Sequence, residues 1–379
     1  MPTVALERLD DPAALESLDP SGMLRVVAGS AAQIRTSLRS VQEASLEQLG
    51  LESRPRAIVV AGMGGSGISG EVLAALTAAK SPVPVVVHRG YGLPGWVGAA
   101  DLVMAVSCSG TTAETLSSAV EAARRGARLL GVGAAGSPLD LHCRSEHGAY
   151  VPVTGQLAPR ASLWALITPL VVVAQQAGLL DLGADLGDLE AAATRLEAIA
   201  SACRPDLESF VNPAKSLAAE LLGTLPMFWG CGDVGPVSAT RAACQVMENA
   251  KSAAMAGALP EAHHNQSVAL DGRLAGAVAE EDIFRDRVAD PDPFRLRLVL
   301  LRDDDGGMAS ARADASAEVA RARGVGVSVV TAEGASRFER LASIVGLVDF
   351  ASVYLGLASG FDPTPIGPID DLKARLAND

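Results

Sequence analysis

Cysteine is scarce in this chain of 379 residues, and its five copies follow no pattern. Their number is odd, and no two of them are spaced as C-x-x-C. A disulfide framework or a zinc site is therefore not expected, and the reducing cytoplasm fits the composition best. The five are Cys108, Cys143, Cys203, Cys231 and Cys244.

Long apolar runs and basic segments are also missing. The longest apolar stretch, residues 163–173, is interrupted by Pro169 and is too short to span a bilayer. The N-terminus has early acids and no basic segment before an apolar run, so no signal peptide is expected. With 31 Lys and Arg against 44 Asp and Glu, the formal net charge is −13. Such an acidic surface repels nucleic acid and anionic membranes, so neither is an expected partner.

What the chain does have is a repeated alternation of short apolar runs and helical spacing. The runs are unbroken, as expected for strands that are covered on both faces. Repeated strand–helix–strand units predict an α/β domain with a doubly wound parallel sheet and right-handed crossovers. The expected strands are residues 57–60, 83–87, 102–106 and 128–132, and the expected helices between them are 68–79 and 112–125.

The same rhythm restarts in the second half of the chain. Helical regions at residues 162–178 and 186–202 end where Arg204-Pro205 interrupts the pattern, so we expect two domains, residues 1–203 and 204–379. The second half is expected to contain strands 227–229, 296–301 and 327–330 and helices 237–255 and 338–357.

A glycine-rich loop, residues 62–67, lies directly after the first strand and before a helix. Its glycines allow close approach of a ligand to the free N–H groups of the helix. The loop matches the dinucleotide fingerprint G-x-G-x-x-G, but the confirming acid is missing because Val87 is followed by His88. Taken alone, the loop is either an anion site or a turn without a ligand.

A second loop, S-C-S-G-T-T at residues 107–112, favours the anion site. It lies between strand 102–106 and a helix, at the carboxyl edge of the sheet where ligands bind in doubly wound folds. Capping the helix would need only one hydroxyl, and neither loop has the lysine of a P-loop. We therefore predict a neutral phosphate cradle. Its expected residues are Gly64, Gly65, Ser66, Ser107, Ser109 and Thr112.

The motif S-x-S-G-x-T following G-G-S resembles the sugar isomerase (SIS) domain, a flavodoxin-like fold that holds phosphosugars. Further blocks extend the resemblance over nearly the whole chain to the bifunctional phosphoglucose/phosphomannose isomerases. It implies two SIS domains and interconversion of glucose 6-phosphate or mannose 6-phosphate with fructose 6-phosphate, without metal or organic cofactor. It also implies a homodimer. The blocks are residues 19–23, 159–160, 248–251, 259–265 and 362–365, with Leu372-Lys373 near the end.

The resemblance also implies roles for four side chains. Glu248 takes the place of the base that moves a proton between C1 and C2, and His264 that of the ring-opening histidine donated by the partner subunit. Arg160 matches the arginine that stabilises the enediolate. Lys373 matches a lysine that assists ring opening, which requires Ile369 and Leu372 to anchor the last helix. Such groups suit these tasks, because a carboxylate can act as the base and an imidazole can give and take protons near neutral pH.

The second half is expected to hold no phosphate of its own, because carboxylates at residues 303–305 stand where the first half has hydroxyls. Two alternatives stay open. A non-catalytic sugar-phosphate sensor needs only the cradle, and an amino-sugar phosphate isomerase shares it. The acid–base set argues against the sensor. The lack of a glutaminase domain argues against the isomerase half of an amidotransferase.

Overall fold

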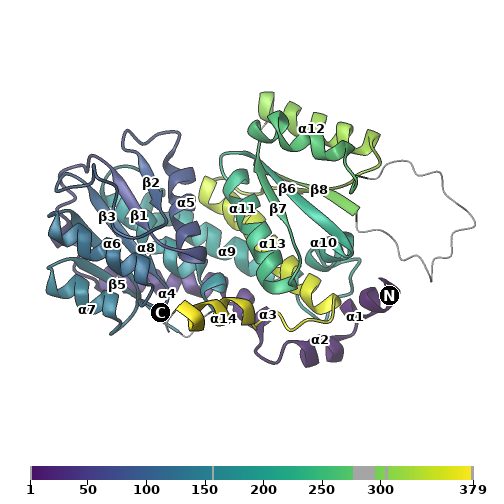
Figure 1. Cartoon of the computed structure of the whole chain (residues 1–379), viewed down its shortest axis with the longest axis horizontal. Helices are drawn as coiled ribbons and strands as arrows, with labels where there is room; N and C mark the ends of the chain where they lie inside the picture. The colour runs from purple at the N-terminus through teal and green to yellow at the C-terminus, as the bar shows by residue number, and fades with distance from the viewer. Residues whose placement is uncertain (1, 156–157, 276–294, 304–305, 377–379) are drawn as a thin grey trace, which may run out of the picture. The chain divides into compact units, whose positions relative to one another are not determined.

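The computed structural model describes residues 2–155, 158–275, 295–303 and 306–376, which divide into two compact units (Figure 1). The first unit comprises Ala28–Glu197 and Gly334–Ala342. The second unit comprises Met1–Val27, Ala198–Glu333 and Ser343–Asp379. Each unit is built on its own parallel sheet, which confirms the predicted fold class of two doubly wound α/β domains.

The first unit has a five-stranded parallel sheet in the order β2-β1-β3-β4-β5. Helices α4, α5 and α8 lie on one face, and α6 and α7 lie on the other (Figure 1). The strands are β1 (Ile58–Ala61), β2 (Val85–His88), β3 (Leu102–Ser107), β4 (Arg128–Ala134) and β5 (Ala149–Val153). The helices are α4 (Ser30–Glu43), α5 (Gly64–Thr77), α6 (Ala113–Arg124), α7 (Pro138–Ser145), α8 (Leu163–Gln176) and α9 (Gly187–Ala202), with 3₁₀ turns η1 (Glu47–Leu49), η2 (Pro159–Ala161) and η3 (Ala184–Leu186).

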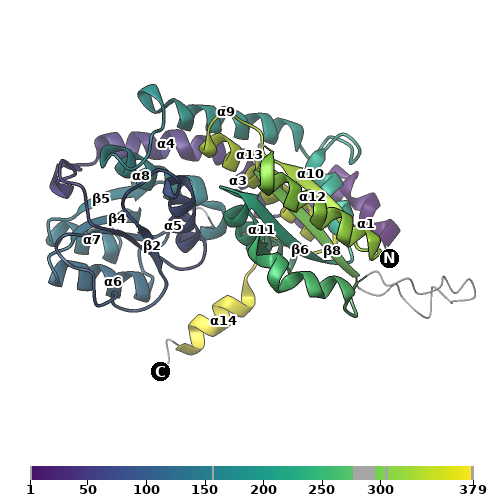
Figure 2. The same ribbon diagram turned by 90° about the horizontal axis from the view of Figure 1, so that it is seen from above.

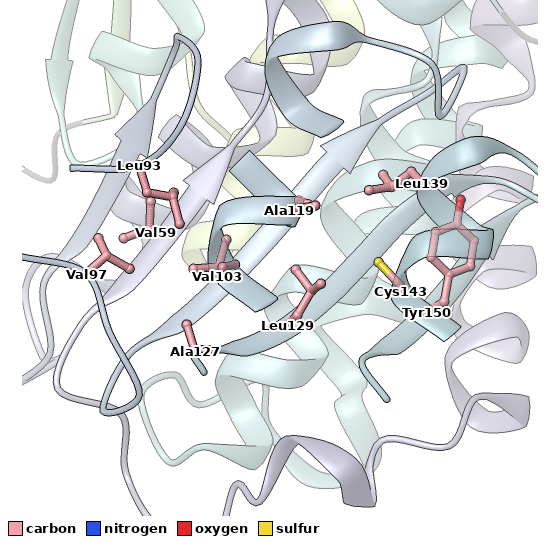
Figure 3. Close-up of a cluster of buried hydrophobic side chains, with 12 residues drawn as sticks. Val59, Leu93, Val97, Val103, Ala119, Ala127, Leu129, Leu139, Cys143 and Tyr150 are labelled. Carbon is pink, nitrogen blue, oxygen red and sulfur yellow. The ribbon is translucent and has the colours of Figure 1, made fainter. Parts of the chain in front are cut away.

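The face of this sheet under α6 and α7 carries a compact hydrophobic cluster (Figure 3). Val103 and Leu129 extend from neighbouring strands toward Ala119 of α6 and Leu139 of α7, and all four are almost fully buried. Small alanines on α6 let the helix approach the branched strand residues closely, which gives the interdigitated packing of a protein interior.

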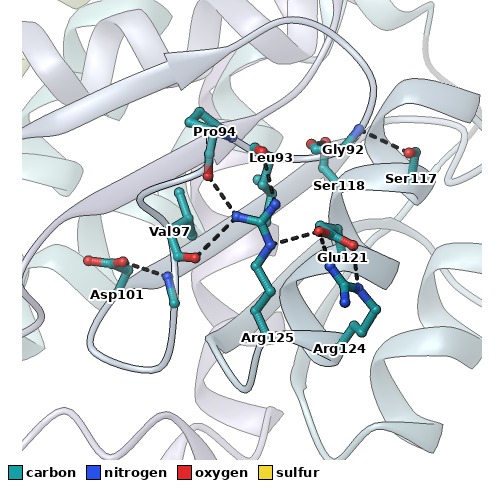
Figure 4. Close-up of polar contacts among 11 residues, drawn as sticks. Gly92, Leu93, Pro94, Val97, Asp101, Ser117, Ser118, Glu121, Arg124 and Arg125 are labelled. Carbon is teal, nitrogen blue, oxygen red and sulfur yellow. Dashed lines mark hydrogen bonds and ion pairs between the residues drawn. The ribbon is translucent and has the colours of Figure 1, made fainter.

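The long connection from β2 to β3 is fastened to α6 by Ser117 and Ser118, which bond Gly92, and to the end of α6 by Arg125 (Figure 4). Arg125 donates to the carbonyl oxygens of Leu93, Pro94 and Val97 at 3.2, 2.7 and 3.2 Å, and its Nε donates to Glu121 at 2.7 Å. A guanidinium has enough donors to satisfy several carbonyls at once, so the connection is ordered without forming a helix or strand.

The second unit has a four-stranded parallel sheet in the order β7-β6-β8-β9. Helix α12 covers one face, and α10 and α11 cover the other, with α13 beside α11 (Figures 1 and 2). The strands are β6 (Thr224–Gly232), β7 (Met255–Ala258), β8 (Arg295–Asp303) and β9 (Gly326–Thr331). The helices are α1 (Pro2–Leu9), α2 (Pro12–Leu18), α3 (Met23–Ala28), α10 (Pro213–Leu221), α11 (Gly235–Ala250), α12 (Gly307–Ala322), α13 (Arg337–Ala358) and α14 (Gly367–Leu376), with turns η4 (Glu261–His264) and η5 (Gln266–Asp271). The start of α13, up to Ala342, is counted with the first unit, and the end of α9, from Ala198, with the second.

The compact units differ from the contiguous ranges 1–203 and 204–379 that the sequence predicts. The N-terminal helices belong to the second unit, where Arg8 Nη1 donates to the Ala358 carbonyl at 3.0 Å and the Ser209 amide donates to Asp10 at 2.7 Å. Residues 334–342 belong to the first unit, where Phe338 packs edge-on against Trp164 with ring centroids 5.9 Å apart. Contacts between segments distant in sequence therefore decide which unit each segment joins.

Two strands were not predicted from the sequence. Strand β5 contains Pro152, which is tolerated because β5 is an edge strand of the first sheet. Strand β7 begins at Met255, within the range 237–255 that helical spacing predicts as helix. That helix, α11, instead ends at Ala250, where Lys251 adopts a left-handed conformation with φ of 56°. The predicted range was wrong at that end.

Helix α13 is long and apolar enough to cross a membrane, judged by length and composition alone. In the structure, 94% of its most apolar window is buried inside the protein. Its composition is therefore accounted for by its place in the interior.

We expect Leu139→Ala to destabilise the protein by about 2–5 kcal/mol, because the fully buried leucine leaves a cavity beneath α7. Leu141→Ala is the matched control, since Leu141 lies on the same helix and is 62% exposed, and it should cost less than about 0.5 kcal/mol. Urea unfolding followed by circular dichroism measures both. Equal effects of the two substitutions would contradict this account of the core.

Candidate active site

The two predicted loops meet at the carboxyl edge of the first sheet. They follow β1 and β3, which are hydrogen-bonded neighbours. The Cys108 amide donates to Ser66 Oγ at 3.3 Å, and a Cβ on Gly62 would lie only 2.9 Å from the Val106 carbonyl oxygen. Gly64 has φ of +49°, a conformation that favours glycine. The glycines therefore allow the loops to come together.

The hydroxyl groups of the second loop form a connected network. Ser107 Oγ lies 2.9 Å from Thr112 Oγ1 and 3.5 Å from Ser109 Oγ, and it accepts from the Gly110 amide at 3.0 Å. Ser107 is buried, Thr112 is half-buried and Ser109 is exposed, so the network runs from the interior to the surface. We call Gly64–Ser66 together with Ser107–Thr112 the cradle.

The helices that begin at the cradle have no side-chain caps. Neither Met63 before α5 nor Thr112 before α6 makes a side-chain cap hydrogen bond, a feature that these helices share with α4, α8, α11 and α12. Thr112 directs its hydroxyl to Ser107 instead, so the alternative that it merely caps the helix is wrong. The N-termini of α5 and α6 thus supply N–H groups and partial positive charge at the edge where the hydroxyls gather, an arrangement suited to a phosphate.

Arg160 lies beside the cradle in the same unit. It belongs to turn η2 and is 4% exposed. A Cβ on Gly65 would lie 2.9 Å from the Pro159 carbonyl oxygen and 3.5 Å from the Arg160 Cα, so α5 touches this turn through a glycine. The structure therefore brings all six predicted cradle residues and Arg160 together.

A thiol makes a second link between the cradle and the arginine turn. Cys108 Sγ donates to Ser162 Oγ at 3.4 Å, and Ser162 Oγ donates to the Ala158 carbonyl at 3.0 Å. Burial raises the pKa of the Cys108 thiol, which keeps it protonated and able to donate. Sequence reasoning did not identify Ser162, although its place two residues after Arg160 is a usable signal.

The corresponding helix start in the second unit is occupied by the protein's own carboxylate. Asp303, at the end of β8, accepts the Val234 amide at 2.8 Å just before α11. A carboxylate in this position repels a phosphate. The expectation of one cradle per chain stays a prediction, since Asp304 and Asp305 lie outside the described residues.

Glu248 lies on α11 of the second unit and is half-buried. Its helix is fixed to α13 by a buried ion pair, in which Arg241 contacts Asp349 at 2.6 Å, and Gln245 Nε2 donates to the same carboxylate at 3.0 Å. Spacing places Arg241, Gln245 and Glu248 on one stripe of the helix. The first two are buried against α13, so the stripe fixes the orientation of the helix on which Glu248 lies.

The adjacent histidines differ in their surroundings. His263 Nε2 lies 2.7 Å from Ser316 Oγ and the ring packs edge-on against Trp229, and burial lowers its pKa. His264 is exposed, which leaves its imidazole accessible. Gln266 also has a structural contact, because its Oε1 accepts from Trp229 Nε1 at 2.7 Å.

Lys373 lies on α14, which has no buried residues. Ile369 and Leu372, the expected anchors of this helix, are 40% and 61% exposed, so the expectation that they anchor it is wrong for this structure. The segment before α14 is fastened by Lys251, whose Nζ donates to the carbonyl oxygens of Glu248 at 2.6 Å and Pro363 at 2.9 Å. Within the described ranges, no group of three His, Cys, Asp or Glu side chains is placed to hold a metal ion.

The chain is similar to known proteins along most of its length. It is 30% identical over 320 residues to a bifunctional phosphoglucose/phosphomannose isomerase of Caldicellulosiruptor bescii, a match that covers 84% of this chain and 89% of that protein. This chain belongs to the bifunctional phosphoglucose/phosphomannose isomerase family. Residues 53–172 match the SIS domain, and residues 210–376 match the bacterial phospho-glucose isomerase C-terminal SIS domain.

One further relative and one solved structure are also similar to this chain. A bifunctional phosphoglucose/phosphomannose isomerase of Aquifex aeolicus is 29% identical, covering 85% of this chain and 90% of its own. A hypothetical protein of Thermus thermophilus has a solved structure with a TM-score of 0.67 and 16% identity, covering 99% of this chain and 95% of that one. The second comparison supports the fold alone. The predicted family and two-SIS-domain fold are therefore confirmed.

We expect Ser107→Ala in this isomerase family member to weaken binding of fructose 6-phosphate at least about tenfold, because hydrogen bonds to charged groups contribute about 1.5–3 kcal/mol. Ser107 Oγ also organises the loop through Gly110 and Thr112. Isothermal titration calorimetry measures the Kd, with the exposed Ser145→Ala as control. An unchanged Kd in folded Ser107→Ala protein would show that the phosphate binds elsewhere.

Proposed function

We propose that this protein interconverts glucose 6-phosphate, mannose 6-phosphate or both with fructose 6-phosphate. The main support for this proposal is the cradle. There, two helix N-termini and a network of hydroxyl groups lie next to the buried turn that contains Arg160. This combination suits a phosphate monoester attached to a group that develops negative charge. Membership of the isomerase family supports the same reading.

The reaction moves a hydrogen between two neighbouring carbons of an opened sugar. Glu248 takes the proton from C2 and returns it at C1, and the electron pair left behind forms a cis-enediolate. Its half-buried position suits a carboxylate that must remain reachable by substrate while being partly shielded from water. Because the reaction is an internal redistribution of atoms and electrons, it consumes no external oxidant or reductant.

The remaining groups act on the ring and on the developing charge. Arg160 stabilises the enediolate oxygens, an interaction that strengthens as the charge forms. His264 exchanges the proton needed for ring opening, and Lys373 assists at the same step. His264 and the residues of α14 are exposed, which supports the proposal that His264 and Lys373 contact substrate or a partner subunit and not the core of their own unit.

The working unit in this proposal is a homodimer in the cytoplasm, and His264 acts on the sugar held by the partner subunit. In a twofold dimer each subunit would donate one imidazole and receive one.

A coupled assay that detects fructose 6-phosphate tests the overall reaction. We expect product from glucose 6-phosphate, mannose 6-phosphate or both. Thermal stabilisation by these sugars without any product would favour the non-catalytic sensor instead. Faster turnover of glucosamine 6-phosphate than of either hexose phosphate would favour the amino-sugar phosphate isomerase.

Glu248→Gln is expected to lower kcat by about 10²–10⁴-fold, the usual contribution of a general base, while KM changes only a few-fold. The amide preserves shape and cannot accept the C2 proton. Glu318→Gln, an exposed change of the same chemistry on α12, should leave kcat unaltered. Full turnover by Glu248→Gln would place the base elsewhere.

The donated histidine is tested by mixing two inactive variants. If Glu248 and His264 of different subunits serve one sugar, a mixture of Glu248→Gln and His264→Ala protein regains activity. Random reassortment of subunits in twofold dimers leaves one intact site in each mixed dimer, or about a quarter of wild-type activity. Recovery should be absent when either variant is assayed alone. If mixed dimers form without regaining activity, both residues act within one subunit.

A further inference from the structure

A buried glutamine on α4 contacts the turn that carries Arg160. Helix α4 buries a stripe that is unusually polar for an interior face, and Gln33 within it is only 8% exposed. Both atoms of its amide are used. Nε2 donates to the Ala161 carbonyl at 2.8 Å, and Oε1 accepts the Ala165 amide at 3.3 Å. The buried polar residues of the stripe are Ser30, Gln33, Ser37 and Ser40.

These two hydrogen bonds act on both sides of the junction between η2 and α8. Ala161 directly follows Arg160, and Ala165 lies in the first turn of α8. Ser162, the residue before α8, makes no side-chain cap bond, and its hydroxyl instead donates to the Ala158 carbonyl and accepts from Cys108 Sγ. Gln33 therefore caps α8 from a different helix and, with the same side chain, fixes the residue next to Arg160.

A neighbouring serine strengthens the attachment. Ser37, one turn further along α4, donates from Oγ to the Ala165 carbonyl at 2.8 Å. On the opposite side, the Pro159–Arg160 backbone meets α5 at Gly65, so the turn is held from two directions. A buried amide with both of its atoms bonded has one favoured orientation, which makes it an effective geometric restraint.

We propose that Gln33 is a positioning residue for Arg160, one that sets where the guanidinium stands relative to the cradle without touching substrate. This inference rests on the proposed function, in which Arg160 stabilises the enediolate. Displacements of about 1 Å at a reacting centre are costly, so losing the restraint should lower turnover more than binding.

The test replaces the amide by a thioether of similar length, Gln33→Met, which removes both hydrogen bonds and little volume. We expect kcat for fructose 6-phosphate to fall about tenfold. The inhibition constant of inorganic phosphate, which probes the cradle alone, should stay within about twofold. Gln42→Met is the matched control, because Gln42 lies on the same helix and is exposed. A similar loss of kcat in Gln42→Met would attribute the effect to α4 in general and overturn the proposal.

A double-mutant cycle separates this inference from the proposed function. In an Arg160→Ala background, Gln33→Met should change kcat no further, because the group that it positions is gone. If Arg160→Ala alone leaves kcat unchanged, the proposed role of Arg160 fails. If Arg160→Ala lowers kcat but Gln33→Met does not, or if the two losses multiply, only the positioning role fails.

A milder variant covers the case in which Gln33→Met does not fold. Ser37→Ala removes one hydroxyl from the same attachment and should lower kcat about two- to threefold with the phosphate inhibition constant unchanged. Unchanged kcat in folded Ser37→Ala protein, or a parallel loss of phosphate binding, would contradict the proposal.

Discussion

The proposed site faces one electrostatic constraint on which the rest depends: a chain with a net charge of −13 would have to hold a phosphate dianion without a lysine in either loop of the cradle. Backbone N–H groups at the starts of α5 and α6 supply the positive potential, and hydroxyls complete the set of donors. The positions of backbone N–H groups are set by the backbone conformation, so the two loops must adopt one particular conformation. The glycines at 62, 64 and 65 allow that conformation, and at Gly65 the loop also contacts the backbone of Pro159 and Arg160.

The second sheet has the same architecture as the first but a different arrangement at the start of its helix. Its first strand also runs through glycines into a helix, yet Asp303 occupies the helix start. The polar residues of α11 point toward α13 and form a buried ion pair there. The edge of the first sheet is thus open to the anion that we propose, and the second unit fixes the helix on which Glu248 lies.

Much of this could be predicted from the sequence, and the failures have physical reasons. Unbroken apolar runs and glycine-rich loops are local signals, so the sequence predicted the strands and the two loops that meet at the sheet edge. The binding roles of Ser66, Ser107 and Thr112 stay predictions. Strand β5 was missed because Pro152 masks an edge strand, and β7 because alanine and methionine suit a helix equally well. Gln33 gave no signal, since a stripe of Ser and Gln is typical of a solvated helix face and only tertiary packing buries it.

The exchange of segments between the two units constrains how the chain can reach its native state. The hydrogen bond from Arg8 to the Ala358 carbonyl can form only after about 350 further residues have been synthesised, and the contact between Trp164 and Phe338 likewise joins segments far apart in the chain. During synthesis, all five strands of the first sheet therefore leave the ribosome before the segments that bind the N-terminal helices α1 to α3 have been made. Neither unit corresponds to a single stretch of the gene, so no single cut of the chain yields two complete units.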